Sequence, residues 1–339
     1  MYTLLEKNDL NDATSYYIEI VEDVFRRLGH DVKRIHSAKQ VRDEDIVFVV
    51  KVTSMLRVLF RRPKQKIVLW IQGVTPEEAL MADKCKLILY LRKFVLRLIE
   101  RIVIPKAYFI FMVSREMLRH YQKIYGYCKR NYFIMPCFNQ SLNRNSFVEH
   151  KYNVPSFVYS GSLSNWQCFD ETVRIYKKIE KCLPESSFSV LTRETEKAKE
   201  ILQLYNIQRY EIKYVPLEKL NEELEKYKYG FLLRENIEVN RVATPTKLNS
   251  YMAAGIIPIF SNVIVDFKEQ MDNFKYIVEI DDINDVERSA SRILQFEQNV
   301  KVNTSEIFNE YTRMFSQYYN KNLYVCRIYD KIQSMTTKE

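Results

Sequence analysis

The feature that most constrains this chain is a regular alternation of short apolar runs and helical segments along its length. Unbroken apolar runs, such as residues 46–50 and 67–71, are typical of strands buried on both faces of a parallel sheet. Segments of about ten residues or more, with apolar side chains at helical spacing, lie between these runs. The alternation predicts α/β architecture, with doubly wound parallel sheets covered by helices.

The pattern occurs twice. Strands are predicted at 2–5, 31–35, 46–50, 67–71, 108–113 and 132–135, and again at 156–160, 188–191, 210–215, 230–234, 256–260 and 276–280. Helices are predicted at 15–28, 87–104, 115–125, 169–181, 194–205, 217–227, 245–254, 286–296 and in the tail from 304.

A polar segment at residues 139–151 interrupts the alternation and is interpreted as a linker. The chain of 339 residues suits two domains, and its 47% hydrophobic content is enough for two cores. We therefore expect a first domain at 1–150 and a second at 151–317. A C-terminal helix at about 318–339 is expected to pack back on the first domain.

Residues 230–260 carry the most informative motif. A predicted strand ends at Arg234, and Thr244 and Pro245 suit the N-cap and first position of the helix that follows. Lys247 then falls in the first helical turn, where free N–H groups favour phosphate. Arg234 can bind phosphate oxygens bidentately. The motif indicates either a diphosphate clamp or a capped helix with a surface lysine and a salt-bridged arginine.

The run ATPTKLNSYMAAGIIPI at 243–259 resembles the SPTKxxEYLAxGxPVI signature of bacterial glycosyltransferases similar to family 4 (group 1). Weaker similarities occur at residues 70–73, 108–115, 132–136 and 157–162, so the resemblance covers nearly the whole chain. It implies a GT-B fold, two Rossmann-like domains facing across a cleft, and a retaining glycosyltransferase.

The resemblance also implies a site. Arg234 and Lys247 would be the catalytic residues that hold the diphosphate. The implied donor-binding residues are Gly161, Ser162, Val215, Asn240, Thr244, Thr246 and Ser250. Those on the cleft or acceptor side are Thr14, Gln72 and Gly73. No metal and no cofactor are expected, since the nucleotide-sugar is the donor substrate.

Two departures from the family pattern leave alternatives open. The broader family has two acids separated by seven residues, and these positions are Val242 and Ser250 here. The first loop, residues 10–15, lacks the Gly-rich turn. The predicted function is transfer of a hexosyl group to a saccharide or lipid-linked acceptor in cell-surface polysaccharide synthesis. The alternatives are another nucleotide-sugar enzyme, such as an epimerase, and a non-catalytic GT-B protein that binds saccharide or serves as a scaffold.

The first half of the chain is basic. Residues 1–150 hold 26 Lys and Arg against 16 Asp and Glu, and the remainder holds 26 against 27. The segment from Lys84 to Lys106 combines basic residues with apolar residues at helical spacing. It is either a helix that contacts an anionic membrane or a core-packed helix with a charged outer face. Nucleic acid is disfavoured because no recognisable binding motif accompanies the charge.

Several function classes are excluded by missing motifs. Neither GxGxxG nor GxxxxGK[ST] occurs, which argues against dehydrogenases and P-loop enzymes. The six cysteines form no CxxC pair, and the acids at 43–45 and 281–282 are interpreted as solvated turns. No apolar stretch approaches the ~20 residues that span a bilayer, and no leader follows Met1. We therefore expect a cytoplasmic protein, which would lie peripherally on the inner membrane face if the basic helix contacts lipid.

Overall fold

The computed structural model describes residues 1–7, 9–10, 14–81 and 85–336. The chain folds into two compact units. Unit 1 comprises Met1–Phe138, Arg241–Thr244 and the residues from Asn320 onward. Unit 2 comprises Asn139–Asn240 and Pro245–Tyr319. The chain therefore enters unit 2 after Phe138 and not at residue 150, and the segment predicted as a linker belongs to unit 2.

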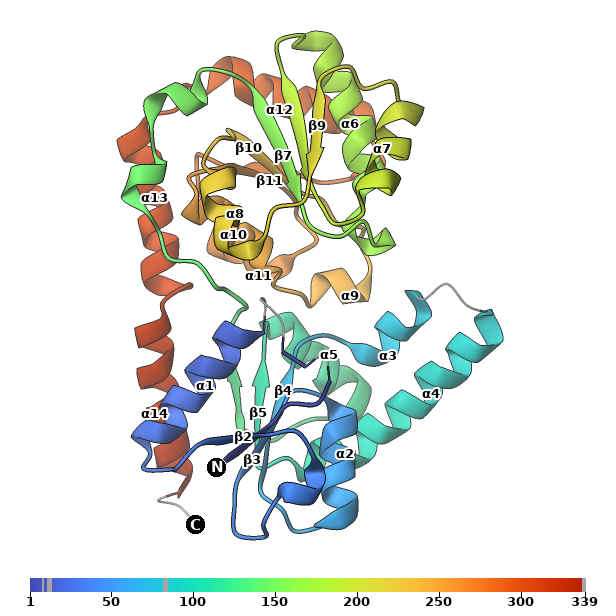
Figure 1. Ribbon diagram of the computed structural model, residues 1–339, viewed down its shortest axis with the longest axis vertical. Helices are drawn as coiled ribbons and strands as arrows, with labels where there is room; N and C mark the ends of the chain where they lie inside the picture. Colours follow the sequence, from blue (N-terminus) through green and yellow to red (C-terminus); the bar gives the residue numbers. More distant parts are fainter. Residues whose placement is uncertain (8, 11–13, 82–84, 337–339) are drawn as a thin grey trace. The chain divides into compact units, whose positions relative to one another are not determined.

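Unit 1 contains a six-stranded parallel sheet in the order β2-β1-β3-β4-β5-β6 (Figure 1). Its strands are β1 (Tyr2–Leu4), β2 (Lys33–Ile35), β3 (Val47–Val49), β4 (Ile67–Ile71), β5 (Phe109–Met112) and β6 (Tyr132–Ile134). Its helices are α1 (Ser15–Arg27), α2 (Val52–Arg61), α3 (Thr75–Glu78), α4 (Lys86–Val103), α5 (Arg115–Tyr125) and α14 (Lys321–Thr336).

Unit 2 contains a second six-stranded parallel sheet, in the order β12-β11-β10-β7-β8-β9. Its strands are β7 (Ser156–Ser160), β8 (Ser187–Leu191), β9 (Tyr210–Lys213), β10 (Tyr229–Leu232), β11 (Ile257–Ser261) and β12 (Val278–Ile280). Its helices are α6 (Phe169–Cys182), α7 (Thr195–Leu204), α8 (Leu217–Leu224), α9 (Glu238–Arg241), α10 (Thr246–Ala253), α11 (Val265–Gln270), α12 (Val286–Asn299) and α13 (Thr304–Gln317). Helix α6 packs with α12 and α8 packs with α10, so helices line both faces of the sheet (Figure 1).

Large aromatic side chains fill both cores. In unit 1, Tyr17 of α1 stacks on Trp70 of β4 with ring centroids 3.9 Å apart. Every residue of β4 is buried, as the continuous apolar run predicts. In unit 2, Phe157 of β7 stacks on Tyr229 of β10 with centroids 4.9 Å apart. The predicted doubly wound α/β class is thus confirmed, and burial of both faces explains the uninterrupted apolar runs of central strands such as β3, β4 and β5.

The last helix, α14, packs against α1 within unit 1 (Figure 1). Tyr324 of α14 makes ring contacts with Phe133 and Phe138, at centroid distances of 6.2 and 5.8 Å. The C-terminal segment therefore completes the first unit after the chain has built the second.

In each sheet the strand order reverses once, and this point decides where a ligand can bind. In unit 2, β7 is followed along the chain by β8 and β9 on one side, and the chain then returns to place β10 on the other side of β7. Loops that leave the carboxyl ends of β7 and β10 diverge and leave a crevice there, where doubly wound sheets bind ligands. The corresponding point of unit 1 lies between β1 and β3.

The helix in the 243–259 motif begins later than predicted. Thr244 is not its N-cap, because the helix starts at Thr246 and Pro245 is the capping residue, with extended backbone at ψ 133°. The Thr244 hydroxyl instead accepts a hydrogen bond of 3.1 Å from the Cys137 N–H, within unit 1. A residue before proline is biased towards extended conformations, which delays the helix start.

Candidate functional site

The candidate site lies in unit 2, at the switch point between β7 and β10. Gly161 directly follows β7, and Arg234 lies two residues beyond β10. The two strands are hydrogen-bonded neighbours, with Tyr229 opposite Phe157. Lys247 enters from the first turn of α10, which packs against β10 and β11. Topology alone therefore brings residues from three distant parts of the sequence to one edge of the sheet.

Arg234 is held rigidly and is almost fully covered, with 4% of its surface exposed. Its main-chain N–H donates to the Ser261 hydroxyl at 2.7 Å, and its Nη1 donates to the Leu233 carbonyl at 3.1 Å. Burial lowers the pKa of Arg234, because the charged form loses hydration. Within the described part of the chain, no carboxylate forms an ion pair with this guanidinium. A buried cation without a carboxylate partner is suited to an anionic ligand.

Lys247 extends across the crevice towards the β7 loop. Its Nζ donates to Oε1 of Gln167 at 2.8 Å and lies 4.3 Å from the centroid of the Tyr159 ring. The side chain stays partly accessible. Burial of the ammonium group and the nearby charge of Arg234 hold the pKa of Lys247 well below its ordinary value. Two cations are thus held close together, and a bound anion would relieve their repulsion.

Gly161 has a specific role in this arrangement. A Cβ at this position would lie 2.7 Å from Cε and 2.9 Å from Nζ of Lys247. Its φ of +138° also lies in the range that favours glycine. The absence of a side chain at Gly161 is therefore what allows Lys247 to lie along the loop backbone.

The N-terminus of α10 contributes its own polarity. No side chain caps the helix, so the first-turn N–H groups receive no side-chain acceptor at the cap. Free N–H groups at a helix start bind phosphate oxygens and carry a partial positive charge. Thr246 is the first residue of α10, and the Ser250 hydroxyl donates to the Thr246 carbonyl at 3.2 Å, within the helix. The hydroxyl of Ser250 is thus engaged one turn into α10.

The remaining predicted donor-binding residues are more dispersed. Ser162 lies on the same loop as Gly161, and its hydroxyl is 3.2 Å from that of Ser164. Asn240 is buried at the end of α9 and donates to the Glu235 carbonyl at 2.9 Å. Val215 follows β9, the edge strand of the sheet. Thr244 belongs to unit 1, as does Val242, whose carbonyl accepts from the Ser114 hydroxyl at 2.6 Å.

The three residues predicted for the cleft or acceptor side lie in unit 1, in the connections that follow β1 and β4. Thr14 is buried at the start of α1 and donates to the Asp9 carbonyl at 3.1 Å. Gln72 follows β4, and its Nε2 lies 3.5 Å from the Val50 carbonyl. At Gly73 a Cβ would clash with Oε1 of Glu78 in α3, so a side chain there would displace the end of Glu78. The loop residues at 11–13, which belong to the segment predicted to replace a Gly-rich turn, lie outside the described residues.

A cavity of about 550 Å³ opens in unit 1 beside Gln72 and Gly73. Its wall includes Arg92 and Glu100 of α4. Burial raises the pKa of Glu100 to about 7, although the hydroxyls of Tyr121 and Tyr125 donate to it. The cavity places a carboxyl group that titrates near neutrality next to two residues predicted for the acceptor side.

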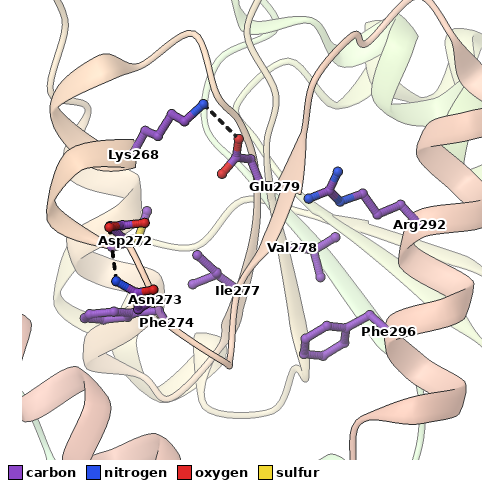
Figure 2. A pocket seen from close by; sticks show the side chains of 10 residues that line it. Lys268, Asp272, Asn273, Phe274, Ile277, Val278, Glu279, Arg292 and Phe296 are labelled. Atoms are coloured by element: carbon purple, nitrogen blue, oxygen red, sulfur yellow. Dashed lines mark hydrogen bonds and ion pairs between the residues drawn. The ribbon is translucent and has the colours of Figure 1, made fainter.

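A second cavity, of about 320 Å³, lies at the opposite end of the unit 2 sheet from β9, along the edge strand β12 (Figure 2). Lys268 pairs with Glu279 across it at 3.5 Å, and Phe274 and Phe296 lie on its walls. It includes none of the predicted site residues and presents no unpaired cations comparable to Arg234 and Lys247. The switch point between β7 and β10 therefore remains the candidate site of unit 2.

Sequence reasoning missed two residues of this site, Tyr159 and Gln167. Tyr159 lies within β7, and in the sequence it cannot be distinguished from an ordinary buried strand residue. Gln167 lies in a single turn of 3₁₀ helix, Asn165–Gln167, and no motif marks it. Only the fold shows that both contact the Lys247 ammonium group.

Comparison with known proteins agrees with this architecture. No family model matches the sequence, and no curated protein matches it. Among solved structures, TarM of S. aureus is similar with a TM-score of 0.65 and 10% identity, over 92% of this chain and 58% of TarM. The pneumococcal O-GlcNAc transferase GtfA, in complex with UDP and GlcNAc, has a TM-score of 0.63 and 11% identity, over 88% of this chain and 58% of GtfA. Trehalose-6-phosphate synthase OtsA has a TM-score of 0.62 and 10% identity, over 94% of this chain and 77% of OtsA.

These similarities establish the fold. The chain has the GT-B architecture of nucleotide-sugar glycosyltransferases, with two parallel sheets of six strands each. It spans 58% of the length of TarM and GtfA. The class defined by the fold is therefore GT-B. The similarities define the architecture of the chain and not the reaction at its candidate site.

Proposed function

We propose that the protein is a glycosyltransferase that moves a hexosyl group from a nucleotide-sugar donor to a saccharide or lipid-linked acceptor. The observation that carries the proposal is the pair of cations, Arg234 and Lys247, held without carboxylate partners at the switch point of unit 2. A nucleoside diphosphate supplies the two negatively charged groups that such a pair requires. UDP is the first candidate, since the structures of TarM and GtfA were obtained with UDP.

The roles follow from leaving-group chemistry. When the bond between sugar and diphosphate breaks, negative charge develops on the diphosphate oxygens. Arg234 would bind these oxygens in a bidentate manner, and Lys247 with the N-terminus of α10 would stabilise the charge as it grows. This stabilisation, together with positioning of the acceptor, supports a metal-independent reaction with retention at the anomeric carbon and without a protein nucleophile.

The acceptor proposal rests on unit 1. Its excess of positive charge and its cavity beside Gln72 suit a saccharide that is itself anionic or attached to an anionic lipid. In this proposal the protein acts in cell-surface polysaccharide synthesis, on the cytoplasmic side and in peripheral contact with the membrane. Within the described residues, no helix is long and apolar enough to cross a bilayer.

A non-catalytic GT-B protein is the second candidate, and one observation favours it. The two positions that carry acids in the broader family are occupied by a buried Val242 in unit 1 and by Ser250, whose hydroxyl bonds to its own helix. Neither can hold a ribose as a carboxylate would. An epimerase on the same fold would use the same diphosphate clamp.

The experiment that tests the proposal is calorimetric titration of UDP, GDP, ADP, TDP and CMP with EDTA present. Preference for one nucleoside diphosphate, and its loss in Arg234→Ala, is the expected result. We expect Arg234→Ala to weaken binding by about 1.5–3 kcal/mol, the range for hydrogen bonds to charged groups. Failure of every nucleotide to bind would refute the donor site and leave the scaffold candidate.

A further inference from the structure

Helix α4 turns its apolar side to solvent. Seven apolar side chains on it are between 44% and 77% exposed: Leu87, Ile88, Leu91, Phe94, Val95, Leu98 and Ile102. Their spacing of three and four residues places them on one side of a helix. A helix that packs on a globular core buries such a side, so the arrangement in α4 is inverted.

The inward side of α4 carries charge, and its contacts fix the orientation of the helix. Glu77 of α3 pairs with Arg97 at 2.6 Å and with Lys93 at 3.5 Å. One turn further on, Glu100 is buried and accepts hydrogen bonds from Tyr121 and Tyr125 of α5, at 3.2 and 2.6 Å. Rolling the helix to hide its apolar side would expose these pairs and break them. The core-packed alternative with a charged outer face is therefore wrong for this helix.

Among the described residues, the charged side chains that border the exposed side of α4 are positive. Lys86, Arg92 and Arg101 are exposed, whereas the single acidic residue of α4, Glu100, is buried on the other side. The last two residues of α2, which packs against α4, are Phe60, 86% exposed, and the exposed Arg61. Lys84, the first residue of the basic segment Lys84–Lys106, lies outside the described residues.

We infer that α4 is a docking helix that lies in the surface of an anionic lipid bilayer, with its seven apolar side chains inserted between headgroups. A large apolar stripe with flanking arginine is the pattern of helices that lie in the plane of a membrane interface. A second copy of the chain is a poorer occupant, because two such faces would oppose Arg92 and Arg101 to like charges with no carboxylate between them. An anionic surface neutralises the same arginines.

Charge excludes a spanning orientation for α4, although its 18 residues would extend about 27 Å, close to the thickness of the hydrocarbon core. The buried side carries Lys93, Arg97 and Glu100, which are held by unit 1 and could not enter hydrocarbon. The helix therefore lies along the surface and does not cross it.

Docking would also define the acceptor, a consequence that rests on the proposed function. The 550 Å³ cavity of unit 1 runs from Arg92, Leu96 and Glu100 of α4 to Gln72 at the end of β4. With α4 in the interface, this cavity would open next to the lipid headgroups. It would suit an acceptor whose polar group leaves the bilayer while its tail stays in it.

Vesicle co-sedimentation tests the inference with the full chain. The protein is mixed with vesicles of phosphatidylcholine alone, or of equal parts phosphatidylcholine and phosphatidylglycerol, at increasing salt. We expect pelleting with the anionic vesicles that weakens as salt rises. Charge reversal at Arg92 or Arg101 should reduce partitioning at least about fivefold each, from the value of one basic side chain near an anionic surface.

Matched variants separate docking from folding. Phe94→Glu should reduce partitioning at least about tenfold, without loss of stability, since Phe94 is 59% exposed. Leu204→Glu, at an apolar residue of α7 that is 71% exposed, should bind vesicles like the wild type. In Phe94→Trp, a blue shift of tryptophan emission on addition of anionic vesicles reports insertion directly.

Three outcomes would overturn the inference. Wild-type protein that ignores anionic vesicles would refute it, as would pelleting that Phe94→Glu leaves unchanged. A dimer that Phe94→Glu dissociates, in protein that does not bind vesicles, would assign the face to a second copy. Nucleotide binding measured in the same variant keeps the two proposals apart, because the donor site belongs to unit 2 and α4 to unit 1.

Discussion

Replacement of Lys247 by methionine separates the electrostatic role of this residue from its packing. Methionine keeps the unbranched shape and removes the charge. In the wild type, Nζ bonds to Gln167 at 2.8 Å and lies over the Tyr159 ring, in a site where Arg234 adds a second positive charge. The substitution therefore removes one of the two cations that would hold a diphosphate.

The expected loss in binding follows from the worth of one charged hydrogen bond. Such a bond contributes about 1.5–3 kcal/mol, which corresponds to a roughly 10- to 150-fold weaker affinity for the nucleoside diphosphate. The N-terminus of α10 and Arg234 remain, so binding should be weakened and not abolished.

The same substitution should make the unliganded protein more stable at neutral pH. The folded state lowers the pKa of Lys247, so between this lowered value and the ordinary value the unfolded chain binds more protons. The free energy of unfolding of the wild type therefore rises with pH through that window. Lys247→Met lacks this dependence, and its advantage over the wild type should shrink as the pH approaches the ordinary lysine pKa.

Two measurements check this prediction, calorimetric titration with UDP and denaturant unfolding across pH. Lys199→Met, at an exposed lysine on α7 in the same unit, is the matched control and should change neither quantity. Wild-type affinity in Lys247→Met would refute the clamp. A less stable Lys247→Met would show that the ammonium group is satisfied in the unliganded fold, contrary to the argument from two crowded cations.

Three further predictions test other parts of the structure. Glu100→Gln should raise the free energy of unfolding at pH 8 by about 3 kcal/mol. The folded state raises the pKa of the wild-type carboxyl from 4.5 to about 7, so the stability that this group contributes below pH 4.5 is lost as the pH rises through 7. Equal pH profiles of unfolding for variant and wild type would contradict this. Gly161→Val should displace the Lys247 side chain and strain the backbone at φ +138°. We expect a loss of about 1–3 kcal/mol of stability and weaker UDP binding in calorimetric titration. Unchanged UDP binding would refute the contact between Gly161 and Lys247. Trp70→Ala should lower the free energy of unfolding by about 3–5 kcal/mol in denaturant titration, since the side chain is 1% exposed and stacks on Tyr17. A decrease below about 1 kcal/mol would contradict this packing.

The strand pattern was predictable because both sheets are parallel and covered. Residues 67–71 and 156–160 were predicted with the bounds that the structure gives, and the interior residues of both strands are buried. Helix α2, Val52–Arg61, was missed although Met55, Val58 and Leu59 follow helical spacing and are buried. Its first turn, Val-Thr-Ser, favours other conformations, and helical periodicity was the signal that could have identified it.

The candidate site was predictable only in part. The resemblance marked Arg234, Lys247 and Gly161, and the structure places these three together. Whether they bind a donor stays a prediction. Thr244 could not be placed from the sequence, because its hydroxyl bonds to Cys137, a partner 107 residues away.

The orientation of α4 also required the structure. The sequence shows both an apolar and a basic side on this helix, and periodicity does not reveal which side faces the protein. The ion pairs of Glu77 with Arg97 and Lys93 decide the question, and these connect residues on two different helices.

Turnover shows whether the cations of unit 2 catalyse sugar transfer from a nucleotide. Release of UDP from UDP-glucose and UDP-GlcNAc would be followed with EDTA present, for the wild type, Lys247→Met and Arg234→Lys. We expect repeated release by the wild type and a decrease in kcat of about 10²–10³ in each variant, the usual effect of removing one group that stabilises developing charge. Tight binding of UDP without release from either donor, or release that neither substitution changes, would contradict it.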